Sequence, residues 1–286
     1  MRATIWGCRG TLASPGPETV RYGGQTSCIA IDSDEDSLLI LDAGTGIRPL
    51  GMSLDGRRPK RVDLLITHLH TDHIEGLRFF GPFWDPDVEF RIWGPPAPTK
   101  NLEQRLAPFF SPPFFPVHMR NVPSRPTFRE VPEEPWTIGS MTVSASLVKH
   151  PGPAVGYRLE DGGHALAYLP DHEPGLGTDL TAVTDRWISG LGIARNADLL
   201  IHDGQYTLGE YHERVGWGHS STPDAVTFAE RAHAGRLVLF HHDPLHSDDD
   251  LEAILSEAER LATSITVELG HEGRVFDLWA PRRESG

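Results

Sequence analysis

The segment that follows the apolar run at residues 62–67 is rich in groups that bind metals. It reads HLHTDH from His68 to His73. Neutral imidazoles and carboxylates are both good ligands for a divalent ion. Because residues leaving the end of a strand can converge on one point, His68 and His70 can share one ion while Asp72 and His73 turn toward a second. A solvated polar turn is the alternative, but such a turn needs far fewer imidazoles.

Further histidines and an aspartate stand at comparable positions elsewhere in the chain. An ion needs three or four protein ligands, so a two-ion site requires residues from other strand ends. His150, Asp171 and the pair His241-His242 each follow an apolar run. Any one of them alone would more often be a surface residue, and their shared position favours a common site. This pattern also gives a reason for the 15 histidines in a chain of 286 residues.

Short runs rich in β-branched residues, bounded by Gly, Pro and Asp, predict the strands that position these groups. The runs lie at residues 4–6, 27–31, 37–41, 62–67, 88–93, 141–148, 155–160, 165–169, 199–202, 237–240 and 266–268. Gly162-Gly163 predicts a hairpin turn. One helix is predicted to begin at Thr222 as its N-cap, and another after Ser247. Strands dominate the first part of the chain and mix with helices later, which favours an α/β sandwich of two sheets covered by helices.

The length of 286 residues, without an obvious linker, predicts one domain over residues 1–286. Residues 94–135 stand out as an insertion that holds many of the 24 prolines together with several phenylalanines. Proline at that density blocks regular structure. A loop folded over the core, a lid beside an active site and an interface between two copies of the chain all remain open for this segment.

The chain has 40 acidic and 26 basic residues and a formal net charge of −14. This balance argues against a surface that grips duplex nucleic acid or an anionic membrane, since both need clustered cations. Cys8 and Cys28 form no disulfide framework and are expected to be buried thiols. Because the sequence has no signal-peptide run and no apolar run of membrane-spanning length, the expected location is cytoplasmic.

The HLHTDH segment, followed by Ile-Glu-Gly-Leu, resembles the HxHxDH signature of the metallo-β-lactamase-fold hydrolases. The resemblance implies a four-layer αββα sandwich with two divalent metal ions at one edge, Zn²⁺ by preference, with Mn²⁺ or Fe also open. It implies that His68, His70 and His150 bind the first ion. Asp72, His73 and the last histidine would bind the second ion, and Asp171 would bridge both.

The last histidine ligand can be His241 or His242. His241 is preferred, because Leu-Val-Leu-Phe-His resembles the strand-then-His pattern of the tRNA 3′-processing branch of these hydrolases. The doublet leaves His242 open as the alternative.

Other segments resemble the phosphodiesterase branch of the same hydrolases. Residues 201–207, IHDGQYT, are similar to its His-Glu-Ala-Thr segment, with Asp203 in place of glutamate. The GHSST run around His219 resembles a loop that contacts the scissile phosphate, although it could also be only an N-cap. The resemblance implies phosphodiester hydrolysis through a metal-bridging hydroxide, with Asp72, His219 and Asp203 as catalytic residues. The metal ions cannot supply a proton to the departing alkoxide. His219, held by Asp203, could supply this proton as general acid.

The substrate implied by this resemblance is small. The long basic arm of tRNA-processing relatives has no room between His150 and Asp171, where the hairpin takes most of the interval. A small cyclic or short single-stranded phosphate ester is therefore predicted, and a homodimer would be ordinary for this fold. Trp217, beside the Gly-His loop, either stacks on a base or packs in the core. Four histidines outside the pattern, His118, His164, His246 and His271, are predicted to be surface or loop residues.

Two rival functions remain open. The same scaffold could hydrolyse a lactone, lactam or thioester. The chain could also be a non-catalytic metal-binding regulatory module, although loss of catalysis usually removes at least one metal ligand.

Overall fold

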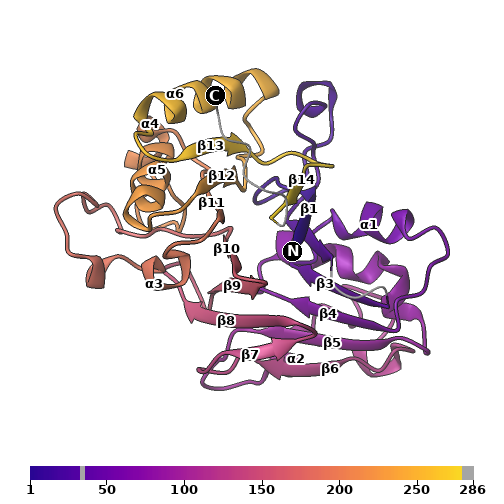
Figure 1. Cartoon of the computed structure of the whole chain (residues 1–286). Coiled ribbons are helices and arrows are strands. Elements are labelled where there is room, and N and C mark those ends of the chain that lie inside the picture. The colour runs from indigo at the N-terminus through magenta and orange to yellow at the C-terminus, as the bar shows by residue number, and fades with distance from the viewer. Residues whose placement is uncertain (33–35, 279–286) are drawn as a thin grey trace.

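The computed structural model describes residues 1–32 and 36–278, which form two seven-stranded sheets (Figure 1). In the first sheet the strand order is β14-β1-β2-β3-β4-β5-β6, and in the second it is β13-β12-β11-β10-β9-β8-β7. The strands of the first sheet are β1 (Arg2–Gly7), β2 (Cys28–Asp32), β3 (Ser37–Leu41), β4 (Arg61–Leu65), β5 (Glu89–Gly94), β6 (Thr127–Glu130) and β14 (Val275–Asp277). The strands of the second are β7 (Trp136–Ile138), β8 (Met141–Leu147), β9 (Val155–Asp161), β10 (His164–Leu169), β11 (Leu199–Asp203), β12 (Arg236–Phe240) and β13 (Thr266–Leu269).

Each sheet is antiparallel at one side and parallel at the other. In the first sheet β14, β1, β2 and β3 pair antiparallel, and β3 to β6 pair parallel. In the second, β7 to β10 pair antiparallel, and β10 to β13 pair parallel. Parallel neighbours end at the same edge of a sheet, so the loops after β3, β4, β10, β11 and β12 can meet there.

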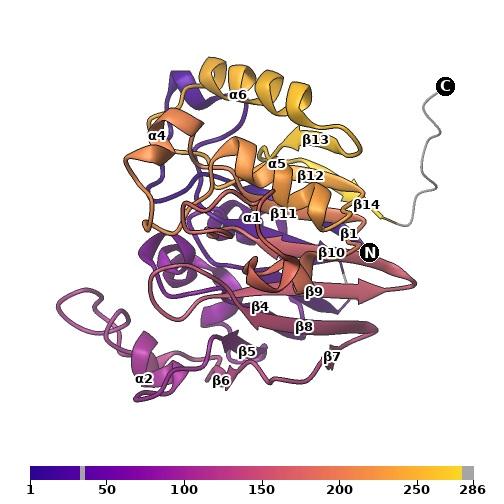
Figure 2. The same ribbon diagram turned by 90° about the vertical axis from the view of Figure 1, so that its left-hand side faces the viewer.

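Helices cover the outer faces of both sheets. They are α1 (Ile47–Ser53), α2 (Leu102–Leu106), α3 (Leu191–Ala194), α4 (Leu208–His212), α5 (Thr222–Arg231) and α6 (Asp248–Leu261). Short 3₁₀ turns are found at η1 (Pro17–Thr19), η2 (Thr71–His73), η3 (Glu75–Phe79), η4 (Gly81–Trp84), η5 (Met119–Asn121) and η6 (Asp185–Trp187). Figure 2 shows α5 lying over β11 and β12, while α1 packs on the other sheet. The arrangement confirms the predicted four-layer αββα sandwich.

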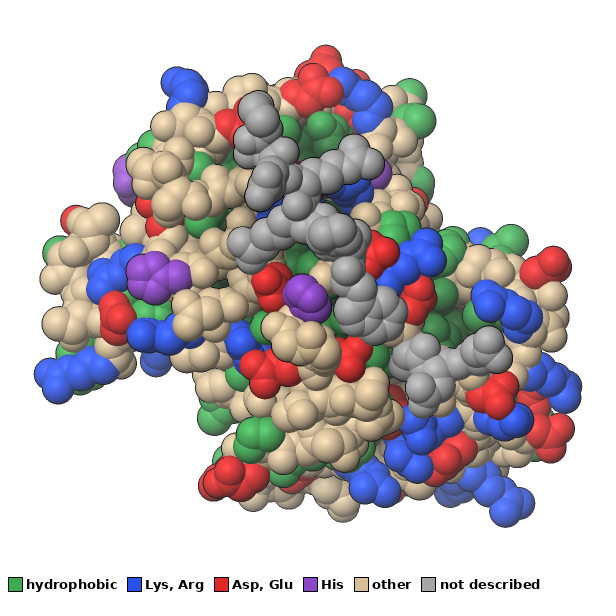
Figure 3. Space-filling model, viewed as in Figure 1, with side chains coloured by type: hydrophobic (Ala, Val, Ile, Leu, Met, Phe, Trp, Pro, Cys, Tyr) green, Lys and Arg blue, Asp and Glu red, His purple; other side chains and the backbone are tan. Residues whose placement is uncertain are grey.

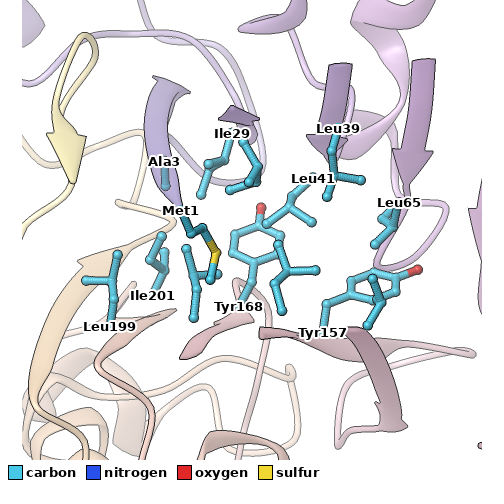
Figure 4. Packing of buried hydrophobic residues seen from close by; sticks show 14 of the residues in the cluster. Met1, Ala3, Ile29, Leu39, Leu41, Leu65, Tyr157, Tyr168, Leu199 and Ile201 are labelled. Carbon is cyan, nitrogen blue, oxygen red and sulfur yellow. The ribbon is translucent and has the colours of Figure 1, made fainter. Parts of the chain in front are cut away.

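The central core lies between the sheets (Figure 4). Ile29 and Leu65 of the first sheet face Tyr157 and Tyr168 of the second, and all four are fully buried. Two further apolar clusters fill the space between each sheet and its helices. Burial on both faces explains why the parallel strands read as nearly continuous apolar runs.

Most of the predicted elements are present. Asp161 pairs with His164, so Gly162 and Gly163 form the turn of the predicted hairpin, with φ of 59° and 83°. Positive φ at both central residues is what a two-residue type I′ turn requires. The cap of α5 was predicted one residue too late, because the Ser221 side chain, not that of Thr222, accepts the hydrogen bond from Asp224 N.

The segment 94–135 contains more regular structure than its prolines suggested. It holds α2, η5 and β6, and β6 pairs with β5 as the outermost strand of the first sheet. An edge strand has free donors and acceptors on one side, so it tolerates nearby prolines. Phe110 is fully buried against Phe83, whereas Phe114 is exposed.

The structure confirms the predicted burial of the two cysteines but contradicts the predicted exposure of His246. Cys8 and Cys28 are buried free thiols, as predicted. His246 was expected on the surface but is buried, because its ring contacts Glu210 and its backbone carbonyl accepts a hydrogen bond from Arg9. On the face shown in Figure 3, basic and acidic side chains are interspersed. None of the helices in the described part of the chain is long and apolar enough to cross a bilayer.

Candidate metal centre

The seven residues predicted as metal ligands lie together where the parallel strands end. Their donor atoms form two adjoining groups, each with all atoms within 4.8 Å of one another. The first group is His68, His70, His150 and Asp171, and the second is Asp72, His73 and His241. The turn η2, which begins directly after His70, folds Asp72 and His73 back toward His241.

Asp171 belongs to the first group and also borders the second. Its Oδ2 is 3.6 Å from His68 Nε2 and 3.7 Å from His150 Nε2. Its Oδ1 is 2.9 Å from His73 Nε2 and 3.3 Å from His241 Nε2. One carboxylate oxygen therefore faces each group, which is the arrangement that a bridging ligand needs.

Hydrogen bonds behind the rings orient the histidines. His150 Nδ1 lies 2.9 Å from Gly218 O, and His241 Nδ1 lies 2.8 Å from Gln205 Oε1. Since these oxygens only accept hydrogen bonds, Nδ1 donates in each ring and Nε2 keeps its lone pair toward the site.

Asp42 holds the ring of His73 in the same way. This buried carboxylate accepts hydrogen bonds from Thr67 N at 2.7 Å, Tyr168 Oη at 2.9 Å and His73 Nδ1 at 2.9 Å. This role of Asp42 was not predicted from the sequence. The signal was present, because Asp42 directly follows β3 just as the ligands follow their strands.

Two buried atoms of the cluster, His68 Nε2 and Asp171 Oδ1, have no well-aligned hydrogen bond among the described residues, although Asp171 Oδ1 lies 2.9 Å from His73 Nε2. Burial alone would raise the pKa of Asp171, but the neighbouring His241, His73 and His68 outweigh it and hold that pKa well below its usual range. Buried polar atoms normally find a partner, and a buried carboxylate needs a nearby positive charge. A divalent cation fits both requirements, so the donor set is suited to metal binding.

The two candidates for the last histidine face opposite ways. His241 has φ of 60°, and this left-handed turn after β12 points its Nε2 to within 3.1 Å of Asp72 Oδ2. His242 is buried with its Nε2 2.8 Å from Gly270 O. Burial lowers the pKa of His242 to about 3, so this ring is neutral and occupied elsewhere. The geometry supports His241 as the candidate ligand.

Two glycines let backbone approach the cluster closely. A Cβ atom on Gly44 would lie 2.2 Å from Asp72 O, and one on Gly10 would lie 2.3 Å from His241 Nδ1. Both distances are far below van der Waals contact, so a larger residue at either place would displace a candidate ligand.

His219 and Asp203 form a pair beside the cluster. His219 Nδ1 lies 2.7 Å from Asp203 Oδ2 and 4.0 Å from Asp171 Oδ2. Burial alone would lower the pKa of His219, but Asp203, followed by Asp171 and Asp72, outweighs it and raises the pKa to about 9. Asp203 also accepts hydrogen bonds from three backbone N–H groups, those of His172, Gln205 and Ser220. The imidazole is thus fixed by a buried carboxylate.

A pocket of about 590 Å³ opens over the cluster. His219, Asp171 and His241 line it, together with Trp217, whose side chain is 59% exposed. The alternative prediction, that Trp217 packs in the core, is therefore wrong. Among the described residues that line the pocket, none comes from 94–135; apolar residues of this segment, such as Leu106 and Phe110, pack in the cluster on the first sheet.

Glu173 is a further residue near the site, and the sequence did not predict a role for it. It is fully buried, and its carboxylate accepts hydrogen bonds from Tyr211 Oη at 2.9 Å, Gly216 N at 2.8 Å and Gly218 N at 2.8 Å. The same Gly218 contacts the ring of His150 through its carbonyl oxygen. Glu173 thereby fixes the loop that leads into His219.

Comparisons with known proteins agree with this geometry. Residues 38–242 match the family model of the beta-lactamase superfamily domain. The chain is 26% identical to the uncharacterized protein Rv1339 of Mycobacterium tuberculosis, over 91% of this chain and 86% of that protein. It is 25% identical to ribonuclease Z of Thermoplasma acidophilum, over 79% and 83% of the two chains. A diphosphatase of the PhnP family superposes with a TM-score of 0.67 at 17% identity, over 97% of each chain. Because the family model spans more than half of the sequence, the chain belongs to the beta-lactamase superfamily, as a hydrolase of the metallo-β-lactamase fold.

Proposed function

We propose that this protein is a binuclear metal-dependent phosphodiesterase that acts on a small cyclic or short single-stranded phosphate ester. The observation that carries the proposal is the His219–Asp203 pair, 2.7 Å apart, on the wall of the pocket over the metal cluster. It supplies the proton donor that an alkoxide leaving group requires. The relatives named ribonuclease Z and PhnP-family diphosphatase support phosphoryl chemistry.

Two divalent ions, Zn²⁺ by preference, would be held by the cluster. His68, His70 and His150 would bind the first, and Asp72, His73 and His241 the second, with Asp171 shared. Such ions activate water at neutral pH and neutralise charge on phosphoryl oxygens. Imidazole and carboxylate donors suit Zn²⁺, and they accept Mn²⁺ or Fe as well.

His219 would act as the general acid. Its Nδ1–H donates to Asp203, which leaves Nε2 as the nitrogen that can carry a proton to the leaving oxygen. Burial lowers the pKa of His219, but the Asp203 carboxylate outweighs this effect and favours the protonated ring. Proton donation of this kind is worth roughly 10²- to 10⁴-fold in rate.

The size of the site supports a small substrate. The pocket is about 590 Å³, which suits a ligand of nucleotide size. Between His150 and Asp171 the chain forms only β9, β10 and their turn, so this interval carries no arm for gripping a folded RNA. The net charge of −14 further disfavours a duplex.

A substrate panel with metal analysis tests the proposal. The purified protein should contain two divalent ions per chain and hydrolyse bis-p-nitrophenyl phosphate and cyclic nucleotides. Turnover of a lactone or thioester, with none of any phosphodiester, would overturn it in favour of the rival hydrolase. Metal binding without any turnover would favour the non-catalytic module.

A further inference from the structure

The mouth of the pocket carries an aromatic and cationic group that the proposed chemistry does not use. It consists of Tyr206, Arg214 and Trp217, all of which line the pocket. The Arg214 guanidinium carbon lies 5.1 Å from the centre of the Tyr206 ring and 5.9 Å from that of Trp217. Tyr206 is buried and forms the base of the group, whereas Trp217 is 59% exposed.

Trp217 is an exposed residue on an anchored loop. The loop that carries it is rigidly attached, because Glu173 accepts hydrogen bonds from Gly216 N and Gly218 N on either side. A large apolar ring is thus held out over the pocket by buried hydrogen bonds, two residues before His219. Such a fixed, solvent-facing ring offers a stacking surface without the entropic cost of ordering a loop.

Arg214 adds a positive charge to this surface. Its Nη1 donates to Glu210 O at 2.9 Å, and within the described residues no carboxylate forms an ion pair with it. Arg214 is also the sole lysine or arginine among the described residues that line the pocket. The acidic side chain at the same mouth, Asp243, already accepts from Leu245 N and from Gln205 Nε2. The guanidinium therefore remains available to a ligand with an electron-rich ring or an anionic group.

From these contacts we infer that Trp217 and Arg214 form a subsite for a flat heterocyclic ring, so that the ester is a nucleotide or the end of a short RNA. This inference rests on the proposed function for the phosphate part of the ligand. The ring would stack on the Trp217 indole while the phosphate lies over the metal cluster. Stacking of a base on an aromatic side chain is sequence-tolerant, so the subsite selects a base without selecting which base.

Paired ligands test the subsite by binding alone. AMP and ribose 5-phosphate share the sugar and the phosphate and differ in the base. The metal-loaded protein should bind AMP about 5- to 150-fold more tightly than ribose 5-phosphate in calorimetric titrations. In Trp217→Ala this preference should fall to near one, and in Trp217→Phe, which keeps a ring, most of it should remain.

Trp187 provides a matched control. It is 70% exposed and has Arg186 5.2 Å from its ring centre, but it does not line the pocket. Trp187→Ala should keep the wild-type preference for AMP. Equal affinity of the wild type for the two ligands, or an unchanged preference in Trp217→Ala, would overturn the subsite.

Two further measurements separate the outcomes. Tighter binding of an adenylate trimer than of AMP would identify an RNA end as the source of the ring, and the reverse would identify a mononucleotide; either supports the subsite. Turnover of bis-p-nitrophenyl phosphate reports the proposed function independently. A preference for AMP without diester turnover would uphold the subsite and refute the phosphodiesterase, and turnover without the preference would do the opposite.

Discussion

His219 stacks on His241, with ring centres 4.9 Å apart and planes inclined by 15°. The proposed proton donor is therefore in van der Waals contact with a proposed metal ligand. The Nδ1 atom of His219 is hydrogen-bonded to Asp203, so the ring has little freedom to leave this position. A proton delivered from His219 would arrive beside the cluster, where a phosphoryl group would be held.

Replacing His219 by alanine should harm poor leaving groups far more than good ones. A p-nitrophenolate ion departs without a proton, whereas an alkoxide needs one. We expect turnover of an alkyl phosphodiester to fall roughly 10²- to 10⁴-fold, and that of a p-nitrophenyl ester by less than about tenfold. Metal content, measured by plasma mass spectrometry, should stay at the wild-type level. An equal loss for both esters would argue that His219 has a structural role only.

The Asp203→Asn variant should move the alkaline limb of the pH profile. Burial lowers the pKa of His219, and the Asp203 carboxylate outweighs this effect and raises it to about 9. Activity that requires protonated His219 disappears as pH rises through the pKa of this ring in the metal-loaded protein. Without the carboxylate the pKa falls, so the loss should begin at a pH lower by about one unit or more. The wild type and the variant should carry the same metal ions, so the difference between their kcat–pH profiles reports the effect of the carboxylate alone. Coinciding alkaline limbs would contradict the role of Asp203 in raising the pKa of His219.

His241 and His242 offer a matched test of the metal site. His241 Nε2 faces Asp72 and Asp171, whereas His242 Nε2 bonds to Gly270 O. His241→Ala should weaken binding of one ion by more than about 100-fold, since loss of a supporting group alone costs 10- to 100-fold. His242→Gln should keep both ions. Metal titration of the stripped proteins checks this, and a normal second site in His241→Ala would return the assignment to His242.

The positions of the proposed ligands could be predicted because each follows a strand that its own composition reveals. HLHTDH, His150 and Asp171 needed only the assumption that strand ends converge. Glu173 could not be predicted in this way, because its partners Gly216 and Gly218 lie in a distant loop whose path depends on tertiary packing.

The sequence missed the short helices α1, α2, α3 and α4, which have four to seven residues each, and several short strands at sheet edges. β6, β7 and β14 have three or four residues each and show no clear alternation. Pairing with a neighbour, rather than local propensity, makes them strands. The burial of His246 was missed for a related reason, since Arg9, which contacts its carbonyl, comes from the other end of the chain.

Replacing Glu173 by glutamine should loosen the loop before His219. The buried carboxylate receives hydrogen bonds from two backbone N–H groups and a tyrosine, and hydrogen bonds to a charged group are worth about 1.5–3 kcal/mol each. We expect the free energy of unfolding to drop by about 1–3 kcal/mol in urea denaturation. The diester turnover of the folded variant should also drop. Glu213→Gln, at an exposed position of the same region, should change neither; equal stabilities of the Glu173 variant and the wild type would contradict this role.

The stability of the metal-stripped protein should fall as pH decreases from about 6.5 toward 4. His202 is fully buried; its Nδ1 lies 2.7 Å from Asp203 O and its Nε2 lies 2.9 Å from His172 Nδ1. Burial lowers the pKa of His202 to about 4. Below pH 6.5 the unfolded chain binds a proton that the folded state refuses, so the stability contributed by the neutral ring is complete above pH 6.5 and is lost toward pH 4. One histidine accounts for about 3 kcal/mol across this window.

His202→Asn should therefore lower the slope of unfolding free energy against pH by up to about 1.4 kcal/mol per pH unit. His212→Asn, at an exposed position, should leave the slope unchanged, and an unaltered slope in His202→Asn would show that this ring takes up its proton without unfolding the protein.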